Sequence, residues 1–154
     1  MGQQQLLLLV LAVTIVGLAV AAGLEAFEEG KRQAAQDALA QRALTIGANI
    51  LTAHREPAQL GGIDVTTEGN DEAVAQAAGY PSPGRFGSGI VAEGAGDEGT
   101  CDIDAVPPVV YIDCGSASTD QGYPTGDIVK ARVDPTADKP VTIASVNADD
   151  HTNE

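Results

Sequence analysis

An uncharged run of nineteen residues, 6–24, constrains this chain more than any other feature. In an α-helix these residues extend about 28 Å, at about 1.5 Å each, which is enough to cross the hydrocarbon core of a bilayer. The run passes without a proline or a turn signal into an alanine-rich stretch that reaches about His54. The sequence therefore predicts one long N-terminal helix, apolar in its first half.

The second half of this helix is predicted to be amphipathic. Its apolar residues recur at alternating spacings of four and three, which places them on one face of a helix. This stripe contains Leu39, Ala43, Ile46, Ile50 and Ala53. Pro57 and the pair Gly61 and Gly62 predict the end of the helix. We expect one face to pack against the chain's own C-terminal domain and another to contact neighbouring chains.

The composition changes near residue 55. All eight prolines and 13 of the 18 glycines follow it, and Leu60 is the only later leucine, against sixteen valines and isoleucines. Branched side chains favour strands, so the second part reads as β-rich. We predict strands at 63–67, 88–93, 109–113, 127–133 and 141–147. Residues 134–140 are expected to join the last two strands as a hairpin, and residues 68–87 and 93–100 to form loops.

These patterns define an α+β fold class, in which a small antiparallel β-sheet domain with one disulfide packs on the long N-terminal α-helix. We divide the chain into four segments. Residues 1–5 form a short leader or N-terminal segment, and residues 6–24 form the apolar transmembrane or filament-core helix. Residues 25–56 continue the helix in amphipathic form. Residues 57–154 form an acidic β-rich domain, expected to be extracellular.

Charge is concentrated in the C-terminal part. The chain carries a formal net charge of −14, and residues 55–154 hold 18 acidic and 5 basic residues. Such an excess argues against nucleic acid or anionic lipid headgroups as partners. With only three lysines, it resembles the surface composition of proteins from high-salt organisms, although a merely soluble, non-sticky surface has the same appearance.

Two cysteines, Cys101 and Cys114, lie in a β-like stretch that contains two prolines. In a chain with a membrane segment, this pair favours one disulfide formed in an oxidising compartment. The alternative is two reduced, buried thiols in a cytosolic domain. A metal site is not expected, because neither His54 nor His151 is spaced near either cysteine.

No catalytic constellation is visible, so we expect no enzyme activity, cofactor or metal. Residues 84–89 (GRFGSG) lack the lysine of a phosphate-binding loop and are interpreted as an ordinary loop. Four acidic residues have carboxylate oxygens of the kind that bind Ca²⁺, but their spacing does not match an EF-hand. Such a group of acids is more commonly a solvated part of the surface. These acids are Asp97, Glu98, Asp102 and Asp104.

The orientation signals conflict. Lys31 and Arg32 follow the apolar run and nothing basic precedes it, which by the positive-inside rule places the C-terminal domain in the cytoplasm. The cysteine pair and the acidic domain indicate the opposite orientation. We favour the outward orientation, since loss of a basic leader would remove the conflict.

The N-terminal third resembles the type IV pilin superfamily, which includes bacterial pilins, secretion pseudopilins and archaeal pilins. The resemblance rests on Gly2 followed by QQQLLLL, on the uncharged run to Leu24 and on the continuous helix to about His54. It covers about a third of the chain. The C-terminal part matches only in class, as a small β-domain with one expected disulfide.

The resemblance implies how the chain would be processed and assembled. A prepilin-type peptidase would cut after Gly2 and leave Gln3 as the new N-terminus. Pilus assembly machinery would then move the helix from membrane lipid into a bundle of identical subunits. We expect ten residues to pack in that helical core: Leu6, Leu9, Ala12, Val13, Val16, Gly17, Val20, Gly23, Leu24 and Phe27.

Two positions depart from the family. Most bacterial pilins carry a glutamate five residues after the cleaved glycine, which pairs with a neighbour's terminal amine, and here that position is Leu7. Amides of Gln3, Gln4 and Gln5 can hydrogen-bond in its place. The family's leader is also normally basic, whereas only Met1 and Gly2 precede the glutamines here.

Two functions therefore stand as hypotheses. The first is a structural subunit of a type IV pilus-like filament at the cell surface, held in the inner or cytoplasmic membrane before assembly. The second is a single-span anchored extracytoplasmic binding domain, or a secretion-system pseudopilin, that forms no long fibres. The small residues in the apolar helix favour the first hypothesis, because they allow neighbouring helices to pack closely.

Overall fold

The computed structural model describes residues 2–84, 89–95, 99–117 and 124–146. Its elements, in chain order, are α1 (Gly2–Arg55), η1 (Ala58–Leu60), α2 (Asp71–Ala77), β1 (Ile90–Val91), β2 (Gly99–Val106), β3 (Val109–Ala117), β4 (Pro124–Val133) and β5 (Val141–Val146). The chain divides into two compact units, Met1–Ala34 and Ala35–Glu154, which are described separately below. The predicted α+β fold class is confirmed.

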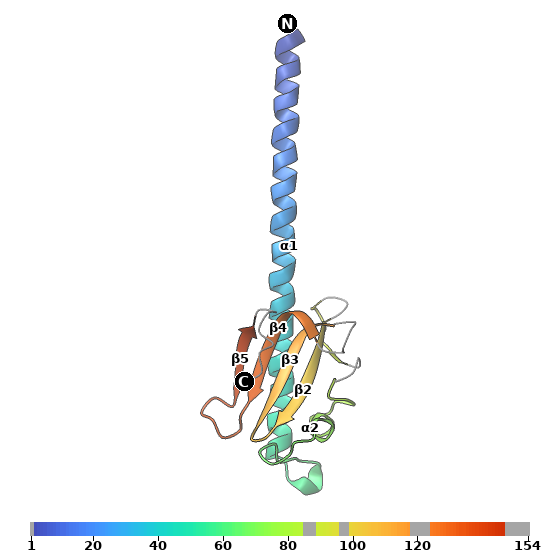
Figure 1. Cartoon of the computed structure of the whole chain (residues 1–154), viewed down its shortest axis with the longest axis vertical. Coiled ribbons are helices and arrows are strands. Elements are labelled where there is room, and N and C mark those ends of the chain that lie inside the picture. Colours follow the sequence, from blue (N-terminus) through green and yellow to red (C-terminus); the bar gives the residue numbers. More distant parts are fainter. Residues whose placement is uncertain (1, 85–88, 96–98, 118–123, 147–154) are drawn as a thin grey trace. The chain divides into compact units, whose positions relative to one another are not determined.

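The second unit contains a five-stranded antiparallel sheet in the order β1-β2-β3-β4-β5, so each strand pairs with the next one along the chain. The part of α1 that belongs to this unit crosses one face of the sheet (Figure 1). Successive side chains of a strand point to opposite faces. As a result, Ile103, Ile112 and Ala131, which are cross-strand partners, all point to the buried face.

The core lies between this face of the sheet and the apolar stripe of α1. All five residues of the predicted stripe are buried, among them Ala43, Ile46 and Ile50 with no exposed surface. They join Ile103 and Ile112 in one hydrophobic cluster. Full burial of an isoleucine side chain contributes roughly 1.5–3 kcal/mol, so these few contacts account for much of the unit's stability.

Gly47 lets α1 approach the sheet closely. A Cβ atom at this position would lie 3.1 Å from a methyl carbon of Val141 and 3.3 Å from one of Val133. A glycine inside a helix weakens it by about 1 kcal/mol relative to alanine. Here that cost is offset by the contact that the missing side chain permits with β4 and β5.

The end of α1 is built as the sequence predicts. The helix stops at Arg55, two residues before Pro57. The chain then reverses, so that the backbone N–H of Ile63 donates to the carbonyl of Ala53 over 3.1 Å. A Cβ atom at Gly62 would overlap the carbonyl oxygen of Glu56, so only glycine fits at this close approach.

The prediction of a strand at 63–67 is wrong, because a side chain competes there for the backbone. The Asp64 carboxylate accepts hydrogen bonds from the backbone N–H and the hydroxyl of Thr66, over 3.0 and 2.6 Å. The Asp64 carbonyl also accepts from the N–H groups of Thr67 and Glu68. An Asx turn of this kind satisfies locally the groups that a strand would pair with its neighbour.

The prediction that 68–87 is all loop is also wrong, since α2 lies within it. Asn70 caps this helix, and its side-chain oxygen accepts from the N–H groups of Glu72 and Ala73. The Asp71 carboxylate then accepts from the N–H of Ala105 over 2.8 Å and ties α2 to β2. Seven residues are too few to show helical periodicity, although the capping residues are visible in the sequence.

β1, β3, β4 and β5 lie close to predicted strands, whereas β2 was not predicted. The predicted strand 88–93 shrinks to β1, and Ser88 lies outside the described residues. The expected loop 93–100 ends early, because β2 begins at Gly99. β3 and β4 extend beyond the predicted 109–113 and 127–133. Residues 134–140 join β4 to β5 as expected, and Asn147 lies outside the described residues.

The expected disulfide is present between Cys101 and Cys114. These residues are direct cross-strand partners on β2 and β3, and both are fully buried. Their Cα atoms lie 4.0 Å apart. The disulfide therefore cross-links two neighbouring strands within the core.

The close approach at Gly47 gives a direct test of the core. We expect Gly47→Leu to lower the free energy of unfolding by about 1–3 kcal/mol, because the added side chain would collide with Val133 and Val141. The neighbouring Ala48→Leu is the matched control, since Ala48 is exposed. Circular dichroism of the tyrosines, recorded while urea unfolds the full chain in detergent, measures the free energy of unfolding of both variants. Equal losses in the two variants would contradict this packing.

Candidate functional site

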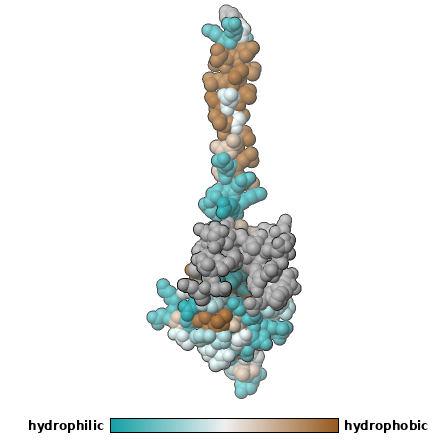
Figure 2. Space-filling view, viewed as in Figure 1, coloured by the Kyte–Doolittle hydropathy of each residue, from teal (hydrophilic) through white to brown (hydrophobic). Residues whose placement is uncertain are grey.

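Residues 6–24 of the first unit present an apolar helix surface on all sides. Every large apolar side chain between residues 6 and 27 is more than half exposed, from Val10 at 51% to Leu18 at 73%. On the face visible in Figure 2 this segment is mostly hydrophobic with a few pale patches, and hydrophilic residues follow further along the helix. A helix that is apolar all round belongs in a membrane or in the interior of a larger assembly. We call residues 6–27 the sleeve, and this sleeve is the candidate functional site.

The ten residues predicted to pack in a filament core lie on one face of this sleeve. Seven of them follow alternating spacings of three and four, which an α-helix brings to one side. These are Leu6, Leu9, Val13, Val16, Val20, Gly23 and Phe27. The other three, Ala12, Gly17 and Leu24, flank the same face. All ten are exposed in the single chain, so their packing in a core stays a prediction.

The opposite face of the sleeve is equally apolar, a feature that our choice of ten residues missed. Leu7, Leu8, Leu11, Ile15 and Leu18 are all exposed there. The signal was present in the sequence, because Thr14 is the only side chain with a hydrogen-bonding group between residues 6 and 24. A surface without a polar stripe suits an environment that is apolar in every direction.

Thr14 does not disturb this surface. Its hydroxyl donates to the carbonyl oxygen of Leu11, over 2.8 Å, within the same helix. A hydroxyl left unpaired in an apolar medium costs several kcal/mol, so this internal bond lets the polar group enter lipid or a helix bundle. The sleeve therefore requires no polar partner at this depth.

Small residues interrupt the sleeve at several points. Apart from its chain neighbours and the surrounding helix backbone, a Cβ atom added at Gly17 or Gly23 would meet nothing within 4 Å. Contacts within the chain therefore do not account for these glycines. In membranes, small residues are enriched where helix backbones approach one another closely.

The last turn of the sleeve is a boundary between apolar and charged residues, because Glu25 lies between Leu24 and Phe27. Glu25 is the first ionisable side chain, and Glu28, Glu29 and Lys31 follow within two turns. The Lys31 ammonium lies 4.8 Å from the centre of the Phe27 ring, a cation–π contact. Aromatic and basic side chains occur together where a helix leaves the hydrocarbon and enters water.

The two residues of the predicted processing site begin the helix. α1 starts at Gly2, Gln3 follows in the first turn, and this turn contains no acidic residue. Gln3 also borders a shallow hollow whose other lining residues are Leu6, Leu7 and Val10. These four positions are i, i+3, i+4 and i+7, the arrangement that accepts a side chain from a facing helix in knobs-into-holes packing.

The length and composition of α1 suffice for one bilayer span, and its most apolar 18-residue window is entirely unburied. Signal sequences near an N-terminus pass the same test. The structure is thus compatible with a pilin-like architecture and, at the coarser level, with a membrane anchor.

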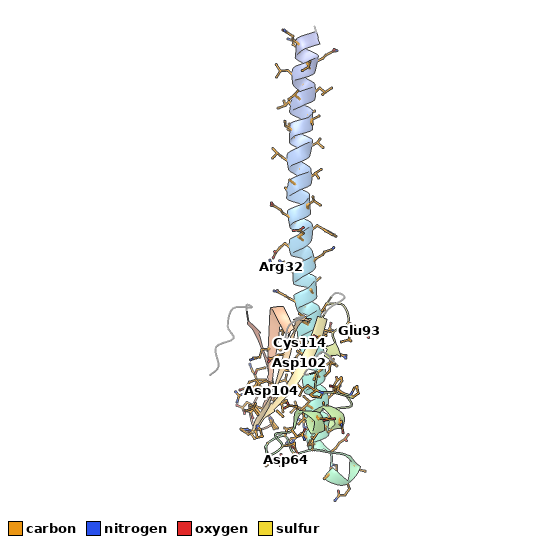
Figure 3. The ribbon with its side chains drawn as sticks, turned by 45° about the vertical axis from the view of Figure 1, so that its right-hand side comes forward. Arg32, Asp64, Glu93, Asp102, Asp104 and Cys114 are labelled. Carbon is orange, nitrogen blue, oxygen red and sulfur yellow. A yellow bond between two sulfur atoms is a disulfide. The ribbon has the colours of Figure 1, made fainter. Side chains whose placement is uncertain are left out.

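The acids considered for Ca²⁺ do not form a common site in the described part of the chain. Asp102 and Asp104 lie two residues apart on the same side of β2 (Figure 3). Asp102 is only 6% exposed, and the nearby N–H of Ile103 donates to the carbonyl of Pro83. Asp97 and Glu98 lie outside the described residues. Among those described, no three His, Cys, Asp or Glu side chains gather as metal ligands.

Arginine and lysine side chains offset acids on the outer face of the sheet. The Lys130 ammonium lies 3.6 Å from the Asp113 carboxylate, and the Arg132 guanidinium lies 2.9 Å from that of Asp134. Asp113 also stands directly opposite Asp102 across β2 and β3. Lys130 and Arg132 are about half exposed, whereas Asp102 is buried, so only part of this face is in contact with water.

Comparisons with known proteins add no relative: no family model, curated protein or solved structure matches the chain.

The turn that follows β4 gives a prediction about pH. Hydrogen bonds from the hydroxyl and the backbone N–H of Thr136, together with the Arg132 charge, hold the pKa of Asp134 below its ordinary value of 3.8. A lowered folded-state pKa stabilises the fold above the unfolded-state value, and this contribution disappears as the pH falls through the folded-state pKa. Asp134 should therefore stabilise the turn at neutral pH and lose this role below pH 3.8.

Thr136→Val tests this account. The variant should raise the pKa of Asp134 toward 3.8, because it removes the first of the hydrogen bonds that lower it. Carboxyl carbon chemical shifts, followed by NMR during an acid titration in detergent, measure the change. Thr66→Val is the matched control: it should raise the pKa of Asp64, which Thr66 lowers in the same way, and leave Asp134 unchanged. An unchanged Asp134 in Thr136→Val would contradict this assignment.

Proposed function

We propose that this chain is a structural subunit of a type IV pilus-like extracellular filament that polymerises through its N-terminal apolar helix. The observation that carries the proposal is the sleeve itself. Its large apolar side chains are more than half exposed, whereas the stripe further along the same helix is buried against the sheet. A surface of this size and composition needs a covering from outside the chain.

Two environments can cover the sleeve: membrane lipid and identical helices. Moving an apolar helix from lipid into a bundle exchanges one apolar surrounding for another, so close packing has to favour the bundle. Gly17, Gly23 and Ala12 leave room for such packing. These features support a bundle of identical subunits as the final state, with lipid as the earlier one.

The second unit suits the outside of such a filament and the outside of a cell. It contains a buried disulfide, and such bonds persist in oxidising compartments. Its acid excess keeps it soluble and resists non-specific association. We therefore propose that the sheet domain lies on the filament surface, outside the cytoplasm. A prepilin-type peptidase and the assembly machinery are the further partners that this function requires.

The competing function is a single-span anchored domain or a pseudopilin that forms no long fibres. The most apolar 18-residue stretch of α1, which is unburied, favours this candidate too. Its length and apolarity suffice to anchor the chain in a membrane without polymerisation. The two candidates differ in the final location of the sleeve, either in lipid or in contact with other copies of itself.

Electron cryo-microscopy of material sheared from the surface of the native cells distinguishes the two functions. We expect thin fibres with residues 6–54 bundled at the centre and the sheet domain outside. Recovery of the protein only from membranes, as monomers or defined complexes, with no fibres at the surface, would favour the anchored domain instead.

A pair of matched variants tests the packing face. Ala12→Leu should abolish fibres while membrane insertion persists, because it adds bulk on the face predicted to pack in the core. Ala22→Leu makes the same chemical change on the opposite face, since Ala22 lies four residues after Leu18 and seven after Ile15, and should keep fibres. Electron microscopy and membrane fractionation measure the two properties. Normal fibres from Ala12→Leu, or from Gly17→Leu on the same face, would refute the close-packed core.

A further inference from the structure

The N-terminal stretch of α1 contains no group that can neutralise a positive charge. Its first turn carries no acidic residue, and the first ionisable side chain after Gln3 is Glu25. Glu25 lies 22 positions after Gln3, which corresponds to about 33 Å along an α-helix. The side chains next to Gln3 along the hollow are those of Leu6, Leu7 and Val10.

Cleavage after Gly2 would create such a charge. A free α-amine has a pKa of about 7.7–8.0 and is largely protonated at neutral pH. At the N-terminus of a helix it meets the positive end of the macrodipole, which disfavours a cation. In a lipid or helix-bundle setting it would also lose its hydration. The new terminus would thus be the least favourable group of the apolar segment.

The residue that cleavage exposes is able to remove this charge by itself. We propose that Gln3, once freed, cyclises to pyroglutamate; the inference rests on the proposed function, since it requires cleavage after Gly2. The α-nitrogen of Gln3 attacks its own side-chain amide carbon, Cδ. A C–N bond forms in a five-membered lactam, the bond from Cδ to Nε2 breaks, and Nε2 leaves as ammonia with a proton from the α-amine. No oxidant, reductant or other reactant is needed.

The product fits the sleeve better than the amine does. The lactam is neutral, and it keeps one N–H donor and one carbonyl acceptor. Gln4 and Gln5 keep their side-chain amides, because their α-nitrogens lie in peptide bonds and cannot take this route. The first turn of the processed helix then carries hydrogen-bonding groups without any charge, and the uncharged stretch extends from the terminus to Leu24.

Intact-mass spectrometry of the full protein from native surface material, combined with fragmentation of its N-terminal peptide, tests the proposal. The expected species begins at residue 3 and is lighter than that chain by one ammonia. A chain that begins at Gln3 with its amine intact would overturn the cyclisation and leave the filament function standing. A chain that still carries Gly2 would overturn both the processing and the cyclisation, and imaging of the same material decides separately whether fibres exist.

Two controls exclude other origins of the mass loss. Gln4→Ala keeps the reactive terminus and should show the same loss, whereas Gln3→Ala should show none. An isotope-labelled peptide with free N-terminal Gln3, added at cell lysis, reports cyclisation during handling. If that peptide cyclises as completely as the protein does, the modification is an artefact and the proposal is refuted. Mass loss that persists in Gln3→Ala would refute it as well.

Discussion

Backbone hydrogen bonding within α1 is the constraint on which the other properties of this chain depend. From Gly2 to Arg55 the backbone forms one helix, so its polar groups are paired internally except at the ends. An apolar medium accepts only a backbone of this kind. Because this pairing is independent of the side chains, one helix is able to present an apolar sleeve to its surroundings and, further along, a one-sided stripe to a sheet.

The two halves of α1 differ in what the sequence was able to predict about them. The stripe was predictable, since apolar residues at spacings of three and four alternate with polar ones, and Leu39, Ala43 and Ile46 are buried accordingly. In the sleeve no such contrast exists, because Leu7 and Leu18 are as apolar as Leu6 and Leu9. Periodicity therefore identifies the sleeve as a whole but does not select one contact face.

In the β-rich part, prediction succeeded where branched side chains dominate and failed where local hydrogen bonds compete with the sheet. It also missed β2, in which a glycine and two aspartates interrupt the apolar residues. β3, β4 and β5 follow runs of valine and isoleucine with a clear turn before β5. Residues 63–67 have a similar composition, but the Asp64 carboxylate folds them into a turn. The place of the disulfide in the core also required the pairing register of β2 and β3, which spacing alone does not provide.

The energies that act on the sleeve are unequal, and this sets which residues matter for assembly. Apolar burial contributes little to the transfer from lipid into a helix bundle, and individual hydrogen bonds between membrane helices contribute only about 1–2 kcal/mol. A charge removed from water without a partner costs several kcal/mol. One unpaired terminal ammonium would therefore outweigh several packing contacts at positions such as Ala12 or Gly17. If the chain is cleaved after Gly2 and assembles through the sleeve, as we propose, the chemical state of Gln3 therefore affects assembly more than the exact fit of any single apolar side chain.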